Sequence, residues 1–258
     1  MITSAQNAKI QWVRKLAAQK KERDDSGCYV IEGVRSVEEA VRSAEICRLI
    51  FYTAPLTPRA AELVRSAAER GIPAEEITEQ LMKSVSDTAS PQGVLAVMEK
   101  RAQSLPENVD FVLLLDTIRD PGNLGTLFRT AAAAGVDLIL LSPGCADPYA
   151  PKVIRSAMGG HLKIPFVQMN WAEMASFLRR FPAMQILASD MEGGQACWNC
   201  DFTKPTTLII GSEADGISDA AQDLSDGKVF IPMSGNIESL NAAVAAGILI
   251  FEVARQRR

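Results

Sequence analysis

The sequence predicts an α/β protein in which a small α/β unit precedes a larger unit built on a parallel sheet. Short apolar runs alternate with helix-like segments along the chain, which is typical of a sheet covered by helices. The run FVLLLD, at residues 111–116, is continuously apolar, as buried parallel strands are. The chain has 258 residues, of which 47% are hydrophobic, so one large domain or two small ones can form a core.

The first unit is expected to span residues 1–105. Residues 5–23 predict a basic helix whose face is either solvated or a surface for phosphate groups. Over residues 27–100, the strand-like runs are CYVIEG, CRLIFYT and GVLAVMEK. The helix-like runs between them are RSVEEAVRSA, PRAAELVRSAAERG and TEQLMKSVSD. The polar residues 101–108 contain a proline and are the expected linker.

The second unit is expected to span residues 106–258. The run DTIRDPGNLGTLFRTAAAAGVDLILLS predicts a strand end, a glycine loop, a helix and a second strand. Residues 152–160 predict a short helix, IPFVQM a strand, and residues 171–181 another helix. MQILASD and TLIIGS are further strand candidates. This alternation favours a parallel sheet with helices on both faces.

The end of the chain predicts a strand at residues 229–233, a turn at residues 234–236, and a helix opened by Glu238-Ser239-Leu240-Asn241. Its apolar stripe consists of Leu240, Val244, Gly247 and Phe251. The other faces of this helix are apolar as well, and a helix that is apolar all round is buried on more than one side. We therefore expect it to pack both on its own sheet and on a second subunit.

Composition excludes several classes of protein. No apolar run reaches the roughly 18 residues that span a bilayer, and the N-terminus lacks the hydrophobic region of a signal peptide. Five cysteines, an odd number, favour reduced thiols and a cytoplasmic protein. The formal net charge of -4 argues against indiscriminate nucleic-acid binding but allows a local basic patch.

Three glycine-bearing loops each follow an apolar strand, at residues 116–123, 211–216 and 231–241. The first leads into a helix that bears Asn123 and Arg129, and the second places Glu213 between two glycines. Taken singly, each loop reads as an ordinary turn. Because loops after parallel strands meet at one edge of a sheet, where such sheets bind ligands, their convergence predicts a site. The glycine spacing does not fit the dinucleotide fingerprint.

The same residues resemble a known family. NLGTLFRTA, LIIGSEADG and IPMSGNIESLNAAVAAGI are similar to the three motifs of the SpoU (TrmH-type) RNA 2′-O-ribose methyltransferases of the SPOUT superfamily. PKVIRSAMGGHLKIPF is similar to a further stretch of that family, and the first hundred residues resemble its ribosomal-protein-like substrate-binding domain. The resemblance implies a deep trefoil knot in the C-terminal domain, a homodimer formed through that domain, and S-adenosylmethionine as the cofactor.

Residue by residue, the resemblance implies a catalytic set and a cofactor-binding set. The catalytic set consists of Asn123, Arg129, Glu213, Ser239 and Asn241. The cofactor-binding set consists of Gly211, Gly216, Ile231, Met233 and Leu240. The residues expected to contact RNA are Lys15, Lys20, Lys21 and Arg155. One position departs from the family, because Ala243 stands where it usually has a serine.

The implied activity is methylation of a ribose 2′-hydroxyl in structured RNA, with ribosomal RNA favoured over transfer RNA because of the substrate-binding domain. Arg129 is expected either to act as a base or to stabilise a developing alkoxide. One alternative is a non-catalytic RNA-binding protein with a degenerate site, which the intact polar set argues against. Another is a conventional nucleotide-binding enzyme, which the absence of a P-loop and of the dinucleotide fingerprint argues against.

Two remaining features predict no separate chemistry. Cys197 and Cys200 have a metal-like spacing but no second pair, so we expect no metal site and favour inert thiols, with redox pairing left open. His161 is the only histidine, and the chain has no nucleophile elbow for a serine-histidine-acid triad. We expect His161 to be structural or to lie near the RNA.

Overall fold

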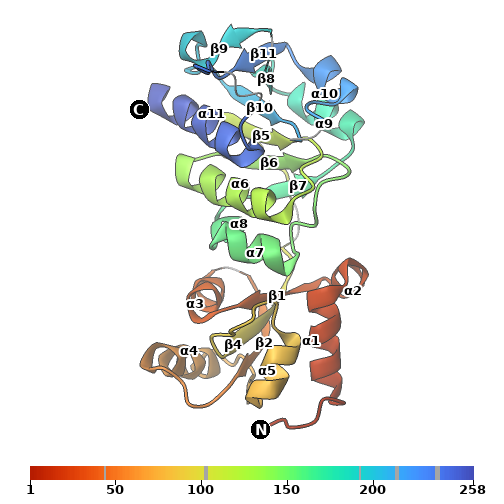
Figure 1. The fold of residues 1–258 in the computed structure, drawn as a ribbon, viewed down its shortest axis with the longest axis vertical. Coiled ribbons are helices and arrows are strands. Elements are labelled where there is room, and N and C mark those ends of the chain that lie inside the picture. The colour runs from red at the N-terminus through yellow and green to blue at the C-terminus, as the bar shows by residue number, and fades with distance from the viewer. Residues whose placement is uncertain (44, 102–103, 192, 213–214, 236–238) are drawn as a thin grey trace. The chain divides into compact units, whose positions relative to one another are not determined.

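A computed structural model describes residues 1–43, 45–101, 104–191, 193–212, 215–235 and 239–258 (Figure 1). The chain forms two compact units, one made of Met1–Ala102 and Asp147–Leu162, the other of Gln103–Ala146 and Lys163–Arg258. The division expected near residue 105 assigns Asp147–Leu162 to the second unit, whereas the structure packs it within the first. The reason is helix α7 (Pro151–Ala157), whose buried Val153 and Ile154 pack against the first unit's strand β1.

The first unit is built on a four-stranded sheet in the order β1-β4-β2-β3, in which β4 runs antiparallel to β1 and β2, and β3 runs parallel to β2. Its strands are β1 (Cys28–Glu32), β2 (Cys47–Tyr52), β3 (Ala74–Glu76) and β4 (Val94–Glu99). Its helices are α1 (Ala8–Ala18), α2 (Lys20–Ser26), α3 (Val34–Arg42), α4 (Pro58–Glu69), α5 (Glu79–Val85), α7 and α8 (Gly160–Lys163). The sequence did not indicate β3, because its three residues are half-buried and contain no apolar run.

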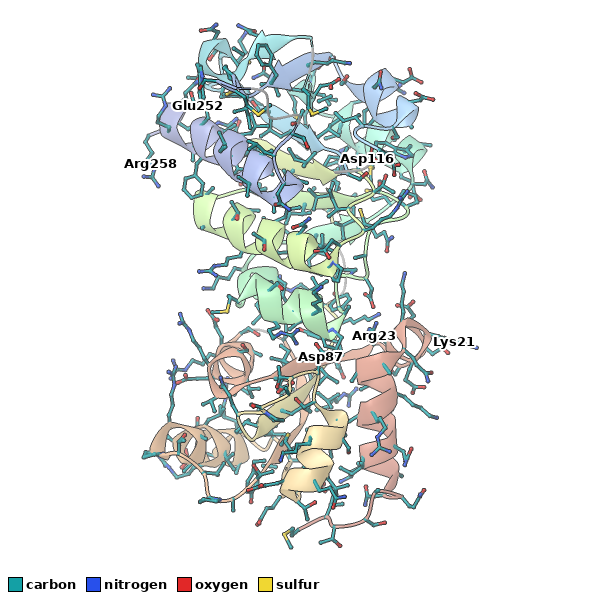
Figure 2. All side chains as sticks on the ribbon, in the orientation of Figure 1. Lys21, Arg23, Asp87, Asp116, Glu252 and Arg258 are labelled. Atoms are coloured by element: carbon teal, nitrogen blue, oxygen red, sulfur yellow. The ribbon has the colours of Figure 1, made fainter. Side chains whose placement is uncertain are left out.

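The single basic helix expected over residues 5–23 is wrong, because Gln19 is extended and separates α1 from α2. Arg23 does not belong to the basic surface, since only 4% of it is exposed. Its Nε and Nη2 lie 2.8 and 2.7 Å from Asp147 Oδ2, and its Nη1 donates to the Leu16 carbonyl at 2.5 Å. Arg23 therefore holds the first unit together, while Lys21 projects into solvent (Figure 2).

His161 lies inside the first unit and is 3% exposed. Its ring meets the Tyr29 ring edge-on, with centroids 6.2 Å apart. Among the residues that the structure describes, neither ring nitrogen has a hydrogen-bond partner. Burial, with a smaller contribution from Arg101, lowers the pKa of His161 from its ordinary 6.5 to about 4. This environment favours the structural interpretation of His161.

We expect the free energy of unfolding to fall as the pH drops through the window between 6.5 and about 4. In that window the unfolded chain protonates His161 and the folded chain does not, so protons favour unfolding by up to about 3 kcal/mol. The Glu45 carboxyl has a pKa raised by burial and contributes with the opposite sign. Urea unfolding of the wild type and His161→Leu at pH 7 and pH 5 isolates the histidine. A fall of equal size in both proteins would show that other groups cause it.

The second unit is built on a seven-stranded parallel sheet in the order β7-β6-β5-β10-β8-β11-β9, which confirms the predicted class. Its strands are β5 (Phe111–Leu115), β6 (Leu138–Leu141), β7 (Phe166–Gln168), β8 (Gln185–Ser189), β9 (Gln195–Ala196), β10 (Thr206–Ile210) and β11 (Gly227–Phe230). Its helices are α6 (Pro121–Ala134), α9 (Trp171–Leu178), the 3₁₀ turn η1 (Cys197–Asn199), α10 (Asp219–Leu224) and α11 (Ala242–Gln256). The sequence did not indicate β9, η1 or α10. None of the described helices has the length and apolarity that a bilayer crossing requires.

Helices α6 and α11 lie side by side on one face of this sheet, and α9 and α10 cover the other face (Figure 1). Alternate strand residues such as Val112 and Leu114 pack with Met174 and Phe177 of α9. Strand β5 is buried throughout, which explains why its sequence is apolar without alternation. The parallel strands place the loops after β5, β8, β10 and β11 at one edge of the sheet.

Helix α11 differs in two respects from the sequence expectation. It begins at Ala242, because the Asn241 side chain accepts hydrogen bonds from the first free backbone N–H groups. Glu238 lies outside the described residues. The helix is also not buried on all sides of this chain, since Val244 is 53% exposed and Phe251 47% exposed. Its last turns pack near η1 and bury Glu252.

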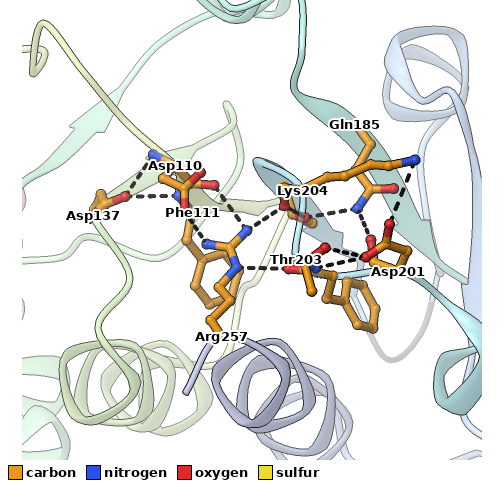
Figure 3. Close-up of polar contacts among 10 residues, drawn as sticks. Asp110, Phe111, Asp137, Gln185, Asp201, Thr203, Lys204 and Arg257 are labelled. Carbon is orange, nitrogen blue, oxygen red and sulfur yellow. Dashed lines mark hydrogen bonds and ion pairs between the residues drawn. The ribbon is translucent and has the colours of Figure 1, made fainter.

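The far end of α11 is fixed at the amino edge of the sheet by Arg257 (Figure 3). The guanidinium donates to Asp110 Oδ2 at 2.7 Å and to the Lys204 carbonyl at 2.6 Å, and it lies over the Phe111 ring. The Asp137 carboxylate accepts the N–H groups of Asp110 and Phe111, both at 2.8 Å. These contacts tie the C-terminus to the starts of β5 and β10, and so orient the helix whose other end opens at the candidate site.

Candidate active site

The loops after β8, β10 and β11 and the first turn of α11 enclose a pocket of about 410 Å³. All five residues expected to bind the cofactor line it, namely Gly211, Gly216, Ile231, Met233 and Leu240. Ser239 of the expected catalytic set lines it too. The remaining lining residues are Ser189, Asp190, Met191, Ile210, Ser212, Asp215, Ile217, Gln222, Ala242 and Ala245. Residues of the second and third motifs, which are separated in sequence, therefore share one concave surface with the loop after β8.

The loop after β10 is closed tightly on itself. Ser212 and Gly216 exchange backbone hydrogen bonds of 3.0 and 2.9 Å, and Gly216 has the left-handed φ of 65° that glycine tolerates best. A Cβ on Gly211 would lie 2.2 Å from the Gly216 carbonyl oxygen. Only glycine fits at position 211, and the pocket wall there is backbone. Glu213, the acid expected in this loop, lies outside the described residues.

An ion pair connects this loop to the one after β5. Arg119 Nη1 lies 2.9 Å from Asp215 Oδ2, and the Ser212 hydroxyl accepts the Asp215 N–H at 3.0 Å. Asp215 lines the pocket, so the loop that leads into α6 is attached to the pocket wall. Both partners are well exposed, so the pair contributes little to stability.

Asn123 and Asn241 join the first motif to the third. The Asp120 side chain caps α6 by accepting the Asn123 N–H at 2.8 Å. The Asn241 side chain caps α11 with its oxygen and donates from its Nδ2 to Asn123 Oδ1 at 3.1 Å. The N-termini of α6 and α11 are thereby held together at the mouth of the site.

Arg129 stands apart from the pocket. It lies on α6, is exposed, and is not among the residues that line the pocket. In the part of the chain that the structure describes, no hydrogen bond or ion pair holds its guanidinium. Its helix neighbours Leu127 and Phe128 are fully buried and fix the helix on the sheet. Within one chain, the structure thus assembles the pocket and the Asn123–Asn241 pair but leaves Arg129 on the surface.

Sequence reasoning missed Ser189, Asp190 and Met191, which follow β8 and line the pocket. Asp190 pairs with Lys228 Nζ at 2.6 Å. The sequence offered only one signal for these residues, which is their position: the strand-like run MQILASD ends in a polar residue, and this strand lies next to the strand TLII. Ala243, the departure from the family, is 5% exposed in the first turn of α11, where it packs rather than facing the pocket.

The remaining expected residues lie outside this site. Lys15, Lys20 and Lys21 are exposed in the first unit, as is Arg155, which pairs with Asp87. Burial raises the pKa of the Cys197 thiol to about 11 and also raises that of Cys200. High thiol pKa values favour the unreactive protonated form.

The family models cover most of both halves of the chain. The SpoU rRNA Methylase family model matches residues 110–251, and the MRM3-like substrate binding domain matches residues 7–96. The chain belongs to the SpoU rRNA methylase family. This confirms the resemblance carried by the three loop motifs, including the N-terminal substrate-binding domain.

Several members of this family are similar to the protein over nearly the whole chain. The 23S rRNA (guanosine(2553)-2′-O)-methyltransferase RlmP of Bacillus subtilis is 34% identical over 252 residues, which is 98% of each chain. The 23S rRNA (uridine(2479)-2′-O)-methyltransferase of Streptomyces viridochromogenes is 33% identical, over 98% of this chain and 92% of its own. The crystal structure of the SpoU methyltransferase AviRb from Streptomyces viridochromogenes in complex with AdoMet superposes with a TM-score of 0.87 at 31% identity. That comparison covers 97% of this chain and 99% of AviRb.

Proposed function

We propose that this protein transfers a methyl group from S-adenosylmethionine to the 2′-hydroxyl of a ribose in ribosomal RNA. The observation that carries the proposal is the pocket, which gathers all five expected cofactor residues at the carboxyl edge of a parallel sheet. Its volume lies in the usual range for small-molecule sites. The 23S rRNA specificities in the names of its relatives support ribosomal RNA as the substrate, and the AdoMet complex of AviRb supports the cofactor.

The residues present fit this cofactor. The rigid backbone turn at Gly211 and Gly216 allows close approach, and the half-buried Ile231 and Leu240 with Met233 supply apolar walls. When bound, the cofactor supplies a methyl group already activated by a sulfonium. The protein then needs mainly to position the ribose and to assist loss of the hydroxyl proton.

We assign Arg129 to stabilisation of the developing alkoxide. A guanidinium is a poor base, but as a fixed cation it is well suited to a growing negative charge. The Asn123–Asn241 hydrogen bond supports this role by fixing the start of the helix that bears Arg129. Ser239 is assigned to the ribose side of the pocket, because it is exposed there next to the first turn of α11.

We propose a homodimer formed through α11. Val244 and Phe251 are exposed apolar side chains about two turns apart on the same face of α11, with the half-buried Gly247 and Ile248 between them. A second copy of the chain would bury this stripe and bring its Arg129 to the pocket. The trefoil knot implied by the family and a cytoplasmic location belong to the same proposal, as does a division of labour in which the first unit holds RNA and the second carries out methyl transfer. The five free cysteines support the location.

Ligand binding separates this function from its rivals. By isothermal titration, the protein should bind S-adenosylmethionine and show no comparable affinity for NAD or ATP. Preference for NAD or ATP would favour a conventional nucleotide-binding enzyme. S-adenosylmethionine binding without transfer to any RNA would favour the non-catalytic alternative.

Substitution of Lys15, Lys20 and Lys21 by glutamine should weaken binding to ribosomal RNA fragments. Each lysine that neutralises one phosphate makes the slope of log K against log salt steeper by about 0.7–0.9. Removal of all three charges should therefore make the slope shallower by roughly two. Filter binding over a range of salt concentrations measures the slope.

The matched control replaces Arg42, Arg59 and Arg65 by glutamine. These are also exposed cations of the first unit, but each is already paired with a glutamate. We expect the control to leave the slope unchanged. Equal effects of the two triple variants would show only a general charge effect and no dedicated RNA surface.

A further inference from the structure

Asp116 is a buried carboxylate that no step of the proposed reaction uses. It directly follows β5, is 1% exposed, and continues the sheet by donating its N–H to the Ile210 carbonyl at 2.8 Å (Figure 2). A buried carboxylate is unfavourable unless hydrogen bonds compensate it. Asp116 receives three, and they come from three different segments of the second unit.

One oxygen of Asp116 holds the loop after β10. Its Oδ2 accepts the Ser218 N–H at 2.7 Å, and Ser218 is the N-cap residue of α10. The two preceding residues, Gly216 and Ile217, line the pocket. The contact therefore anchors the end of the pocket loop whose start is closed by the Ser212–Gly216 bridge.

The other oxygen holds a strained residue. Oδ1 accepts the Thr117 hydroxyl at 2.7 Å and the Ser142 hydroxyl at 3.3 Å, and the Ser142 Oγ accepts the Thr117 N–H at 3.0 Å. Thr117 has a φ of 57°, which is unfavourable for a β-branched side chain. A strained backbone conformation persists only where surrounding contacts hold it in place, and such residues are concentrated at functional sites.

The backbone conformation of Thr117 determines the path of the residues that follow it. Arg119 reaches Asp215 of the pocket wall, and Asp120 caps the helix that bears Asn123. A relaxed Thr117 would redirect this loop. The same carboxylate is thus connected to the cofactor pocket on one side and to the start of α6 on the other.

We infer that Asp116 is a positioning residue that sets the pocket loop ending at Ser218 and, with Ser142, the strained turn at Thr117 from which the catalytic helix begins. This inference rests on the proposed function for the meaning of both elements. It assigns separate consequences to the two oxygens: loss of the Ser218 contact weakens cofactor binding, and loss of the Thr117 contacts slows transfer.

The first arm measures cofactor affinity without RNA. Asp116→Ala should raise the Kd for S-adenosylmethionine about tenfold or more, because it leaves the part-buried Ser218 N–H without its acceptor and frees the end of the pocket loop. Asp116→Asn should restore most of the affinity, because its amide oxygen can accept the Ser218 N–H and the two hydroxyls can reverse direction. Wild-type affinity in a folded Asp116→Ala protein would overturn the inference, even if a lower melting temperature showed a structural role. If Asp116→Ala does not fold, a wild-type kcat in Ser142→Ala would overturn the inference equally.

The second arm is a double-mutant cycle on kcat. Ser142→Ala should lower kcat about tenfold and leave the Kd within about twofold, since it frees Thr117 to relax. Thr117→Gly tolerates the left-handed backbone without support, so adding Ser142→Ala to it should cost less than about threefold. Equal losses in both backgrounds would contradict the role assigned to Thr117. Failure of the wild type to bind S-adenosylmethionine would instead contradict the proposed function.

Discussion

Arg129→Ala should abolish methyl transfer while leaving the Kd for S-adenosylmethionine within about twofold of the wild type. Arg129 does not line the cofactor pocket of its own chain, so its removal takes nothing from the cofactor's binding surface. It removes a charge needed when the alkoxide develops, and a group that acts mainly in the transition state affects kcat more than binding. Single-turnover transfer from labelled cofactor to ribosomal RNA measures the loss.

Arg179→Ala is the matched control, because Arg179 is another exposed arginine of the second unit, placed at the end of α9. It should transfer methyl groups at nearly the wild-type rate. A loss of activity similar to that of Arg129→Ala would mean that the RNA needs positive charge in general. Substantial activity in Arg129→Ala would remove this residue from the mechanism.

Mixing two inactive variants tests where Arg129 acts. Ser239→Ala should damage the pocket in which Ser239 lies, whereas Arg129→Ala should damage the pocket of the partner chain. A heterodimer of the two would contain one site with both groups intact, and activity should return towards at most half the wild-type rate per dimer. If subunit exchange is confirmed by native mass spectrometry and no activity returns, Arg129 serves its own subunit.

Gly211→Ala should weaken S-adenosylmethionine binding roughly tenfold to a hundredfold, on the 1–3 kcal/mol scale of overpacking. The added Cβ would meet the carbonyl oxygen, the carbonyl carbon of Gly216 and the Ile217 nitrogen at 2.2, 2.5 and 2.9 Å. All three are backbone atoms, so the loop itself must move and the pocket wall moves with it. Isothermal titration measures the change directly.

Gly227→Ala is the control for this substitution. Gly227 begins strand β11 of the same parallel sheet, and its added Cβ would only touch a Leu187 methyl at 3.8 Å. Its affinity for the cofactor should match the wild type. Unchanged affinity in Gly211→Ala, with the protein folded, would place the cofactor elsewhere.

The sequence predicted the parts of the molecule whose signals are local. Continuous apolar runs such as β5 mark buried parallel strands, and glycine loops directly after them mark the carboxyl edge. Gly211, Ile231 and Leu240 all lie within such loops. Chain order therefore predicted that these loops meet at one edge of the sheet, and the family resemblance assigned the residues that line the pocket there.

Other features depend on long-range contacts, which leave no periodic signal. Arg23 reads as one more surface cation, but Asp147, distant in sequence, makes it a buried partner. Asp116 reads as a strand end, because its role depends on the backbone of Ser218 and the hydroxyl of Ser142. Arg129 was predicted as a site residue from its place after the first glycine loop and from the family, and a single chain does not bring it to the pocket.

The most direct test of the proposed activity is the chemical identity of the methylated product. Wild-type protein would be incubated with ribosomal RNA and methyl-labelled S-adenosylmethionine, and the RNA digested to nucleosides and separated by mass spectrometry. The account predicts label in a single 2′-O-methylated nucleoside, with none formed by Arg129→Ala. Label on a base, or no transfer by a protein that binds the cofactor and ribosomal RNA, would contradict it.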